Sequence, residues 1–192
     1  MWGLALTKIL RVENKYKGWA KFLVAEVRLP DGTVLRREIE DHGAAVAVLP
    51  YDAARKTAIL VRQFRAPVFY ASGQEQMLEA IAGIQSEADA AVTARREAME
   101  EAGLRLQALE LVATVWTMPG ISTERMSLYL APYARADHLQ EGGGNPAEHE
   151  SIAVIEIGLH ALDAMLQSGR LDDMKTIVLL QALKLRRGDL FK

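Results

Sequence analysis

Arg96-Glu97-Ala98-Met99-Glu100-Glu101-Ala102-Gly103-Leu104 places an arginine and a set of carboxylates directly before a glycine. On a helix, Glu97 lies three residues from Glu100 and four from Glu101, so these carboxylates project toward one side. Like charges at this spacing repel each other, and a divalent cation would relieve the repulsion. Mg²⁺ prefers a few carboxylates together with phosphate oxygens and water. The stretch therefore indicates a metal–phosphate site, and a solvated acidic helix face is the alternative.

The residues upstream predict the elements that carry this stretch. Leu78 to Gly83 is apolar and ends in glycine, which predicts a short strand followed by a loop. Ser86 is expected to begin a helix, with Asp89 three residues later in a capping-box-like relation. Gly103 suits the position just past the helix end. The helix would pack closely on a neighbour through a narrow seam of alanines, namely Ala90, Ala91, Ala94, Ala98 and Ala102.

Gly83 through Leu104 resembles the Nudix box, whose pattern is G-x5-E-x7-R-E-U-x-E-E-x-G-U, where U is apolar. The front half departs from this pattern, because alanine stands at positions 82 and 88 in place of the first glycine and the first glutamate. The loop after Gly83 is thus one residue short, so Glu87 or Asp89 would have to serve near the missing glutamate. A shortened loop of this kind resembles the GDP-mannose pyrophosphatase branch. The positions that match in register are Arg96, Glu97, Ala98, Glu100, Glu101, Gly103 and Leu104.

The resemblance implies an α+β fold, the Nudix α/β/α sandwich, with a small N-terminal antiparallel β-sheet. Residues 1–41 would form this sheet, which in relatives serves dimerisation and the substrate pocket, and residues 42–192 would form the Nudix hydrolase domain. A homodimer is therefore expected. Hydrophobic periodicity and turn residues predict strands at 3–12, 18–29, 33–40, 44–49, 58–64, 76–83, 109–117, 125–133 and 152–158, and helices at 159–168 and 172–187.

The resemblance also implies roles for the box residues. Glu97 and Glu101 would be the main ligands of Mg²⁺, or of Mn²⁺, with Glu100 close by as a ligand or a catalytic group. The backbone carbonyl of Ala82 would take part in metal binding. Arg96 would orient the glutamates by pairing with them.

A glycine-rich loop before the last predicted strand carries the candidates for general base. Glu148 and Glu150 follow Gly142-Gly143-Gly144, and such a hinge lets a carboxylate move over a site. In this branch a glutamate from the loop often activates the attacking water, so one of the two is expected to be catalytic. Glu124 is the next candidate, and a solvated acidic loop is the alternative.

Two arginines and a glutamate are the predicted substrate ligands near the box. Arg62 and Arg65 lie at the end of a predicted strand, and an arginine fork suits a pyrophosphate. An arginine that pairs with a surface acid is the alternative. Glu79, flanked by Leu78 and Ala80, is costly to bury unless it is paired or bound to metal; otherwise it points outward.

Thr117 to Glu124 is a second marker of the branch. Pro119 lies sixteen positions after Gly103, a spacing that resembles the ADP-ribose pyrophosphatases. Trp116 and Met118 beside it would offer a flat apolar contact for a nucleobase. A Pro-Gly turn that simply connects two strands is the alternative.

Composition limits the remaining function classes. The net charge is −2, so no basic field attracts nucleic acid, and the lack of cysteine excludes disulfides and thiolate metal sites. No apolar run reaches ~18 residues, which predicts a cytoplasmic protein without a membrane span. We expect Mg²⁺-dependent hydrolysis of a nucleoside diphosphate sugar of the GDP-mannose or ADP-ribose type, giving a nucleoside monophosphate and a sugar phosphate. The alternative is a binding module that senses nucleotides.

Overall fold

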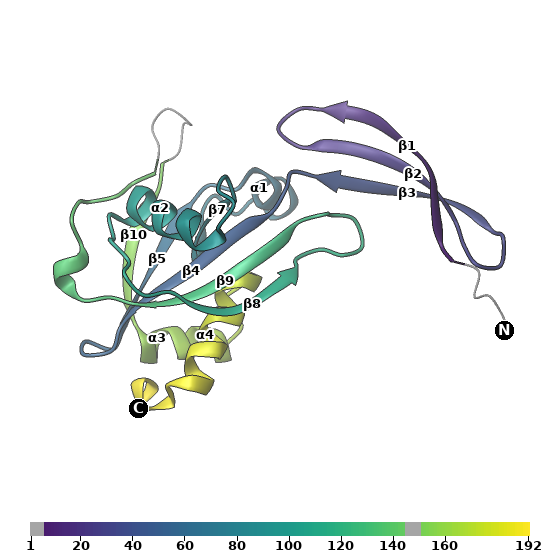
Figure 1. Ribbon diagram of the computed structural model, residues 1–192. Helices are drawn as coiled ribbons and strands as arrows, with labels where there is room; N and C mark the ends of the chain where they lie inside the picture. The colour runs from purple at the N-terminus through teal and green to yellow at the C-terminus, as the bar shows by residue number, and fades with distance from the viewer. Residues whose placement is uncertain (1–5, 145–150) are drawn as a thin grey trace. The chain divides into compact units, whose positions relative to one another are not determined.

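The computed structural model describes residues 6–144 and 151–192, which form two compact units (Figure 1). The first unit runs to Ala44 and also contains Trp116–Met126. The second comprises Ala45–Val115 and Ser127–Lys192. In the described ranges, no helix is both long enough and apolar enough to cross a membrane.

The first unit is built on an antiparallel sheet with the order β1-β2-β3. A turn at Pro30-Asp31-Gly32 joins the second and third strands, with Gly32 at a φ of 88° and Asp31 accepting a hydrogen bond from the Thr33 backbone. The first strand begins later than the prediction of 3–12. The strands are β1 (Lys8–Lys17), β2 (Lys21–Arg28) and β3 (Val34–Asp41).

A loop from the middle of the chain completes this unit along the end of β3. The Glu40 N–H donates to the carbonyl of Ile121 at 2.8 Å, and the Thr123 N–H donates to the carbonyl of Glu40 at 3.0 Å. Two backbone hydrogen bonds on one residue fix the loop to the edge of the sheet. The segment that contains Pro119 therefore belongs to the same unit as β3.

The second unit contains a mixed sheet with the order β10-β5-β4-β9-β8, to which β6 adds beside β5 and β7 beside β4. Every residue of β4 is buried, as expected for a strand that is covered on both faces. Pro50 lies within β4, so the connection to β5 is shorter than predicted. The strands are β4 (Ala45–Asp52), β5 (Thr57–Gln63), β6 (Met77–Glu79), β7 (Ile81–Ile84), β8 (Glu110–Trp116), β9 (Arg125–Pro132) and β10 (Ala153–Gly158).

Helices cover both faces of this sheet, which confirms the α/β/α sandwich (Figure 1). On one face lies α2 (Ala90–Ala102); on the other lie α3 (Leu159–Gln167) and α4 (Met174–Arg186). The predicted alanine seam of α2 is the contact: Ala94, Ala98 and Ala102 are fully buried in a core shared with β4 and β5. These small side chains let the helix approach the sheet closely.

The structure corrects three local predictions. The helix α2 begins at Ala90, because Asp89 is its N-cap and accepts a hydrogen bond from Ala91 at 2.9 Å, so Ser86 does not start the helix. The expected strand 76–83 is interrupted at Ala80. A short helix, α1 (Ala66–Ser72), was not predicted; it starts with a proline in its first turn and ends at Gly73, whose φ is 74°.

Candidate active site

Two carboxylates of the box, both carried by α2, are buried. Glu97 is 9% exposed and Glu101 is 3% exposed, although glutamate is almost never buried without a partner. The Glu97 carboxylate lies against the backbone of Gly83 in β7, so closely that a methyl group at Gly83 would overlap it. A carboxylate from the box helix thus occupies the space that a side chain at position 83 of β7 would need.

Arg96 connects the carboxylates as predicted. It donates to Glu97 and to Glu100, each at 2.5 Å, and its Nη2 also reaches the hydroxyl of Ser86 at 3.3 Å. Burial lowers the pKa of Arg96, but the charges of Glu97 and Glu100 outweigh this effect and raise it overall. The arginine thus offsets the repulsion between the glutamates.

The carboxylates of the box suit a divalent cation, but they do not by themselves form a complete set of ligands. Glu100 has a side chain that is 41% exposed, whereas Glu97 and Glu101 are buried. Within residues 6–144 and 151–192, no group of three metal-ligating side chains is already gathered. Two carboxylates four residues apart nevertheless match the needs of Mg²⁺, which takes its other ligands from water and phosphate. Ala82, the expected carbonyl ligand, pairs with Ala47 between β7 and β4.

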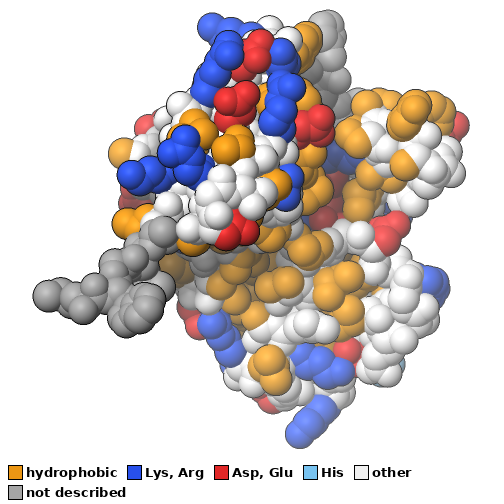
Figure 2. Space-filling view, turned by 90° about the vertical axis from the view of Figure 1, so that its right-hand side faces the viewer, with side chains coloured by type: hydrophobic (Ala, Val, Ile, Leu, Met, Phe, Trp, Pro, Cys, Tyr) orange, Lys and Arg blue, Asp and Glu red, His pale blue; other side chains and the backbone are white. Residues whose placement is uncertain are grey.

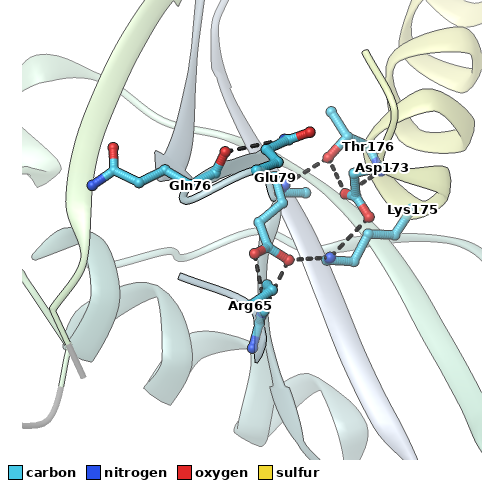
Figure 3. Close-up of polar contacts among 8 residues, drawn as sticks. Arg65, Gln76, Glu79, Asp173, Lys175 and Thr176 are labelled. Atoms are coloured by element: carbon cyan, nitrogen blue, oxygen red, sulfur yellow. Dashed lines mark hydrogen bonds and ion pairs between the residues drawn. The ribbon is translucent and has the colours of Figure 1, made fainter. Parts of the chain in front are cut away.

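A second cluster of charges lies at the end of β6 (Figure 3). Arg65 binds Glu79 side-on, with Nε to Oε1 at 2.8 Å and Nη2 to Oε2 at 3.1 Å. Glu79 is 1% exposed and also pairs with Lys175 from α4. Burial raises the pKa of Glu79, but Arg65 and Lys175 outweigh it and hold the pKa below its ordinary value. Glu79 is therefore buried and paired, and the outward orientation is excluded.

Arg65 lies within electrostatic range of the box. Burial lowers its pKa, whereas the hydrogen bond and charge of Glu79, together with the charges of Glu101 and Asp173, raise it overall. The two arginines differ in surroundings, because Arg62 is exposed on β5 while Arg65 is the N-cap of α1 and turns to Glu79. Of the two arginines, Arg65 is thus the one connected to the box carboxylates.

The residues proposed to contact a base lie in the first unit. Trp116 and Pro119 help to line an open groove of about 600 Å³ along β3, and Arg125 lies 5.2 Å from the centroid of the Trp116 ring. Met118 is exposed and does not line the groove. The groove therefore contains the flat surface expected of a base contact, without Met118.

A histidine flanked by two glutamates was not predicted. Glu40 lies 2.5 Å from Nδ1 of His42, and Glu124 lies 2.7 Å from Nε2, while Trp19 stacks on the ring with centroids 4.9 Å apart. Glu124 is 82 positions from His42 in the sequence. Because Glu124 is engaged by His42, it is less available as a general base than the sequence suggested.

The remaining candidates divide into two groups. Glu148 and Glu150, the predicted bases, lie outside the described residues. The substitutes for the missing box glutamate are near the start of α2: Asp89 caps the helix, and the backbone N–H of Glu87 donates to the hydroxyl of Thr93 at 3.3 Å. The Asp89 side chain therefore has a structural task.

An α/β/α sandwich whose helix buries two carboxylates, one of them against a glycine of the neighbouring strand, has the fold and box arrangement of a Nudix protein. The NUDIX domain matches residues 41–178, and the chain belongs to this family. Members generally need a divalent metal ion. A GDP-mannose pyrophosphatase of Cronobacter sakazakii is 40% identical over 159 residues, which cover 81% of this chain and 82% of the relative.

Further comparisons agree with this family. A GDP-mannose pyrophosphatase of Pectobacterium atrosepticum is 36% identical over 162 residues, covering 82% of each chain. The crystal structure of an ADP compounds hydrolase superposes with a TM-score of 0.76 over 98% of both chains, at 17% identity. At that identity the superposition supports the fold alone, and it extends over the N-terminal sheet as well as the sandwich.

Proposed function

We propose that the chain is a divalent-metal-dependent hydrolase that cleaves the diphosphate linkage of a nucleoside diphosphate sugar, with GDP-mannose as the preferred substrate and ADP-ribose as the rival. The products would be a nucleoside monophosphate and a sugar phosphate. The relatives that are 36–40% identical and carry the name GDP-mannose pyrophosphatase support this substrate. The short loop after Gly83 supports the same choice.

The observation that carries the proposal is the burial of Glu97 and Glu101 on one side of α2, in a box that keeps Arg96 and Glu100. Buried carboxylates are costly to a fold that makes no use of them. A module that only senses nucleotides would have no need to keep Glu97, Glu100 and Glu101 together, so a purely binding role is not favoured.

Glu97 and Glu101 would hold the metal, with Glu100 at the exposed edge and the Ala82 carbonyl as a further oxygen ligand. Mg²⁺ is the proposed ion and Mn²⁺ the alternative; when bound, it would neutralise the diphosphate and acidify water. Arg65 would donate hydrogen bonds to a diphosphate oxygen, with Arg62 as a second predicted contact.

Glu148 or Glu150 would accept a proton from the attacking water. The water oxygen forms a bond to one phosphorus, and the P–O–P anhydride bond breaks, so one phosphate departs with the nucleoside and the other with the sugar. Because the carboxylate then carries the proton, it must return it to solvent before the next turnover.

We further propose a homodimer formed through the N-terminal sheet. Apolar side chains are exposed along β1, among them Ile9 at 64% and Tyr16 at 65%. Figure 2 shows hydrophobic side chains at the surface, set among lysines and arginines. A cytoplasmic location and the absence of a nucleic-acid partner stay predictions from composition.

A substrate panel tests the proposal. The chain is incubated with GDP-mannose or ADP-ribose in Mg²⁺, and the products are separated by ion-exchange chromatography. We expect GMP and mannose 1-phosphate in equal amounts, no turnover in excess chelator, and recovery when Mg²⁺ or Mn²⁺ is restored. Stoichiometric nucleotide binding without any product would contradict the hydrolase proposal and support the nucleotide-sensing module. Preferred cleavage of ADP-ribose would support the proposed reaction but contradict GDP-mannose as the preferred substrate.

A further inference from the structure

The start of α4 is attached to β6 and β7 through an unbroken series of polar contacts (Figure 3). Asp173 is the N-cap of α4 and accepts hydrogen bonds from the Thr176 N–H at 3.1 Å and from the Thr176 hydroxyl. The Thr176 oxygen in turn accepts from the Ala80 N–H at 2.6 Å. The residue next to Glu79 is thus fixed to the helix end.

Lys175 makes a separate connection within the same helix turn. Its ammonium group pairs with Glu79 Oε2 and lies 3.0 Å from Asp173 Oδ1. The side chain is only 13% exposed, so the ammonium group is largely removed from water. A buried lysine is stable when its charge is paired, and two carboxylates on either side of it satisfy this condition.

The cluster as a whole is neutral. Arg65 and Lys175 supply two positive charges, and Glu79 and Asp173 supply two negative charges. Glu79 is the centre, because each of its oxygens contacts Arg65 and one also contacts Lys175. The orientation of the Glu79 carboxylate therefore depends on both cations.

That orientation decides where Arg65 points. A guanidinium group has five N–H donors, and the side-on pair with Glu79 uses one on Nε and one on Nη2. The remaining N–H groups lie outside the pair, and the Arg65 side chain is 40% exposed. The charge of Glu101 acts on Arg65, so the guanidinium group lies within electrostatic range of the box.

We propose that Lys175 is a positioning residue, which fixes the Glu79 carboxylate and thereby aims the free edge of Arg65 at the diphosphate of the substrate. The inference rests on the proposed function, because it takes Arg65 as a diphosphate ligand. Glu79 then acts through Arg65 and does not touch substrate itself. Without Lys175 the Glu79 carboxylate can rotate, and the side-on geometry with Arg65 is lost.

The test measures steady-state kinetics of Lys175→Gln and Lys175→Met with GDP-mannose at saturating Mg²⁺. We expect KM to rise about tenfold with a smaller change in kcat, since a misdirected Arg65 loses a charge-assisted hydrogen bond to the diphosphate, and such a loss corresponds to roughly a tenfold change in affinity. Lys175→Arg, which keeps the charge, should recover most of the affinity. Either neutral variant suffices if the other does not fold.

The matched control is Lys184→Gln. Lys184 lies near the other end of α4 and pairs with Asp163 at 2.6 Å. Its loss should leave KM unchanged, so a comparable KM rise in this variant would overturn the inference. Melting curves of all variants separate loss of fold from loss of affinity.

A double-mutant cycle with Arg65→Gln asks whether Lys175 acts through Arg65. In the Arg65→Gln background, Lys175→Gln should raise KM no further, because the group it positions is absent. Full additivity of the two effects, or an unchanged KM in the Lys175 variants, would overturn the inference. Wild-type protein that turns over no nucleoside diphosphate sugar would instead overturn the proposed function, and the inference with it.

Discussion

The carboxylate of Glu97 lies directly against the backbone of Gly83, on the strand that pairs with β4. Gly83 does not have a positive φ, so the backbone there would accept any residue. The requirement for glycine is therefore purely steric and comes from a side chain fourteen positions later. The helix α2 and the strand β7 before it therefore meet closely at a position where the strand has no side chain.

Gly83→Ala is expected to displace Glu97 and to lower turnover. The added methyl group pushes the carboxylate out of place, and disturbance of groups around a metal typically costs about 10- to 100-fold in affinity or activity. Titration of activity with Mg²⁺ should show a weaker apparent affinity for the ion. Gly188→Ala is the control, because a methyl group at Gly188 meets no atom within 4 Å. Equal Mg²⁺ affinities in both variants would contradict the steric argument.

Glu101→Gln should retain the fold and lose about 100-fold or more in kcat, because a neutral amide binds a hard cation poorly and the metal contributes several kcal/mol to the transition state. Steady-state kinetics paired with a melting curve measures both effects. Glu110→Gln is the comparison, since Glu110 forms a surface pair with Arg186 and should not affect kcat. Near-normal turnover in Glu101→Gln would remove Glu101 from the metal site.

The sequence predicted the fold well where a feature depends on residues that are close together in the chain. The alanine seam identified the buried face of α2, and Gly103, with a φ of 65°, ends the helix as expected. The start of α2 was misplaced because Ser86 and Asp89 both resemble caps, and only the folded chain shows which one accepts the hydrogen bond. The short helix α1 after Arg65 was missed because its two turns are too short to show helical periodicity in the sequence.

Contacts between distant segments could not be predicted. Glu79 and Lys175 are 96 positions apart, and His42 and Glu124 are 82 apart, so no spacing rule relates them. The sequence showed that Glu79 needed a partner if buried, and it indicated Arg65 as a ligand. It had no means to join Glu79 to Arg65, because their pairing depends on β6 lying beside β5 and the start of α1.

Stability should depend on the charge of His42. Burial lowers the pKa of His42, but hydrogen bonds to the carboxylates of Glu40 and Glu124, together with their charges, outweigh it and raise the pKa above its ordinary value of 6.5. A raised pKa means that the stabilisation is fully present below about pH 6.5 and is lost as the pH rises through the folded-state value. His42→Gln should therefore lower the melting temperature by a few degrees at pH 6 and by less at pH 8.5.

Calorimetry over this pH range measures the effect, and His160→Gln, at an exposed position in α3, is the control. If the wild type and His42→Gln differ by the same amount at every pH, packing against Trp19 accounts for the loss and the ion pairs do not.

The last prediction concerns assembly. All of β1 except Glu13 is exposed, including Ile9, Leu10, Val12 and Tyr16, and an exposed apolar edge strand is a surface that proteins normally cover. We expect light scattering at micromolar concentration to give twice the 21.2 kDa of one chain. The double substitution Ile9→Glu and Val12→Glu should shift the protein toward monomer, because buried charges oppose association. Lys15→Gln, which only removes the surface pair with Glu13, should not. A wild-type monomer that hydrolyses GDP-mannose at full rate would refute the dimer, and a dimer that survives the double substitution would move the interface away from β1.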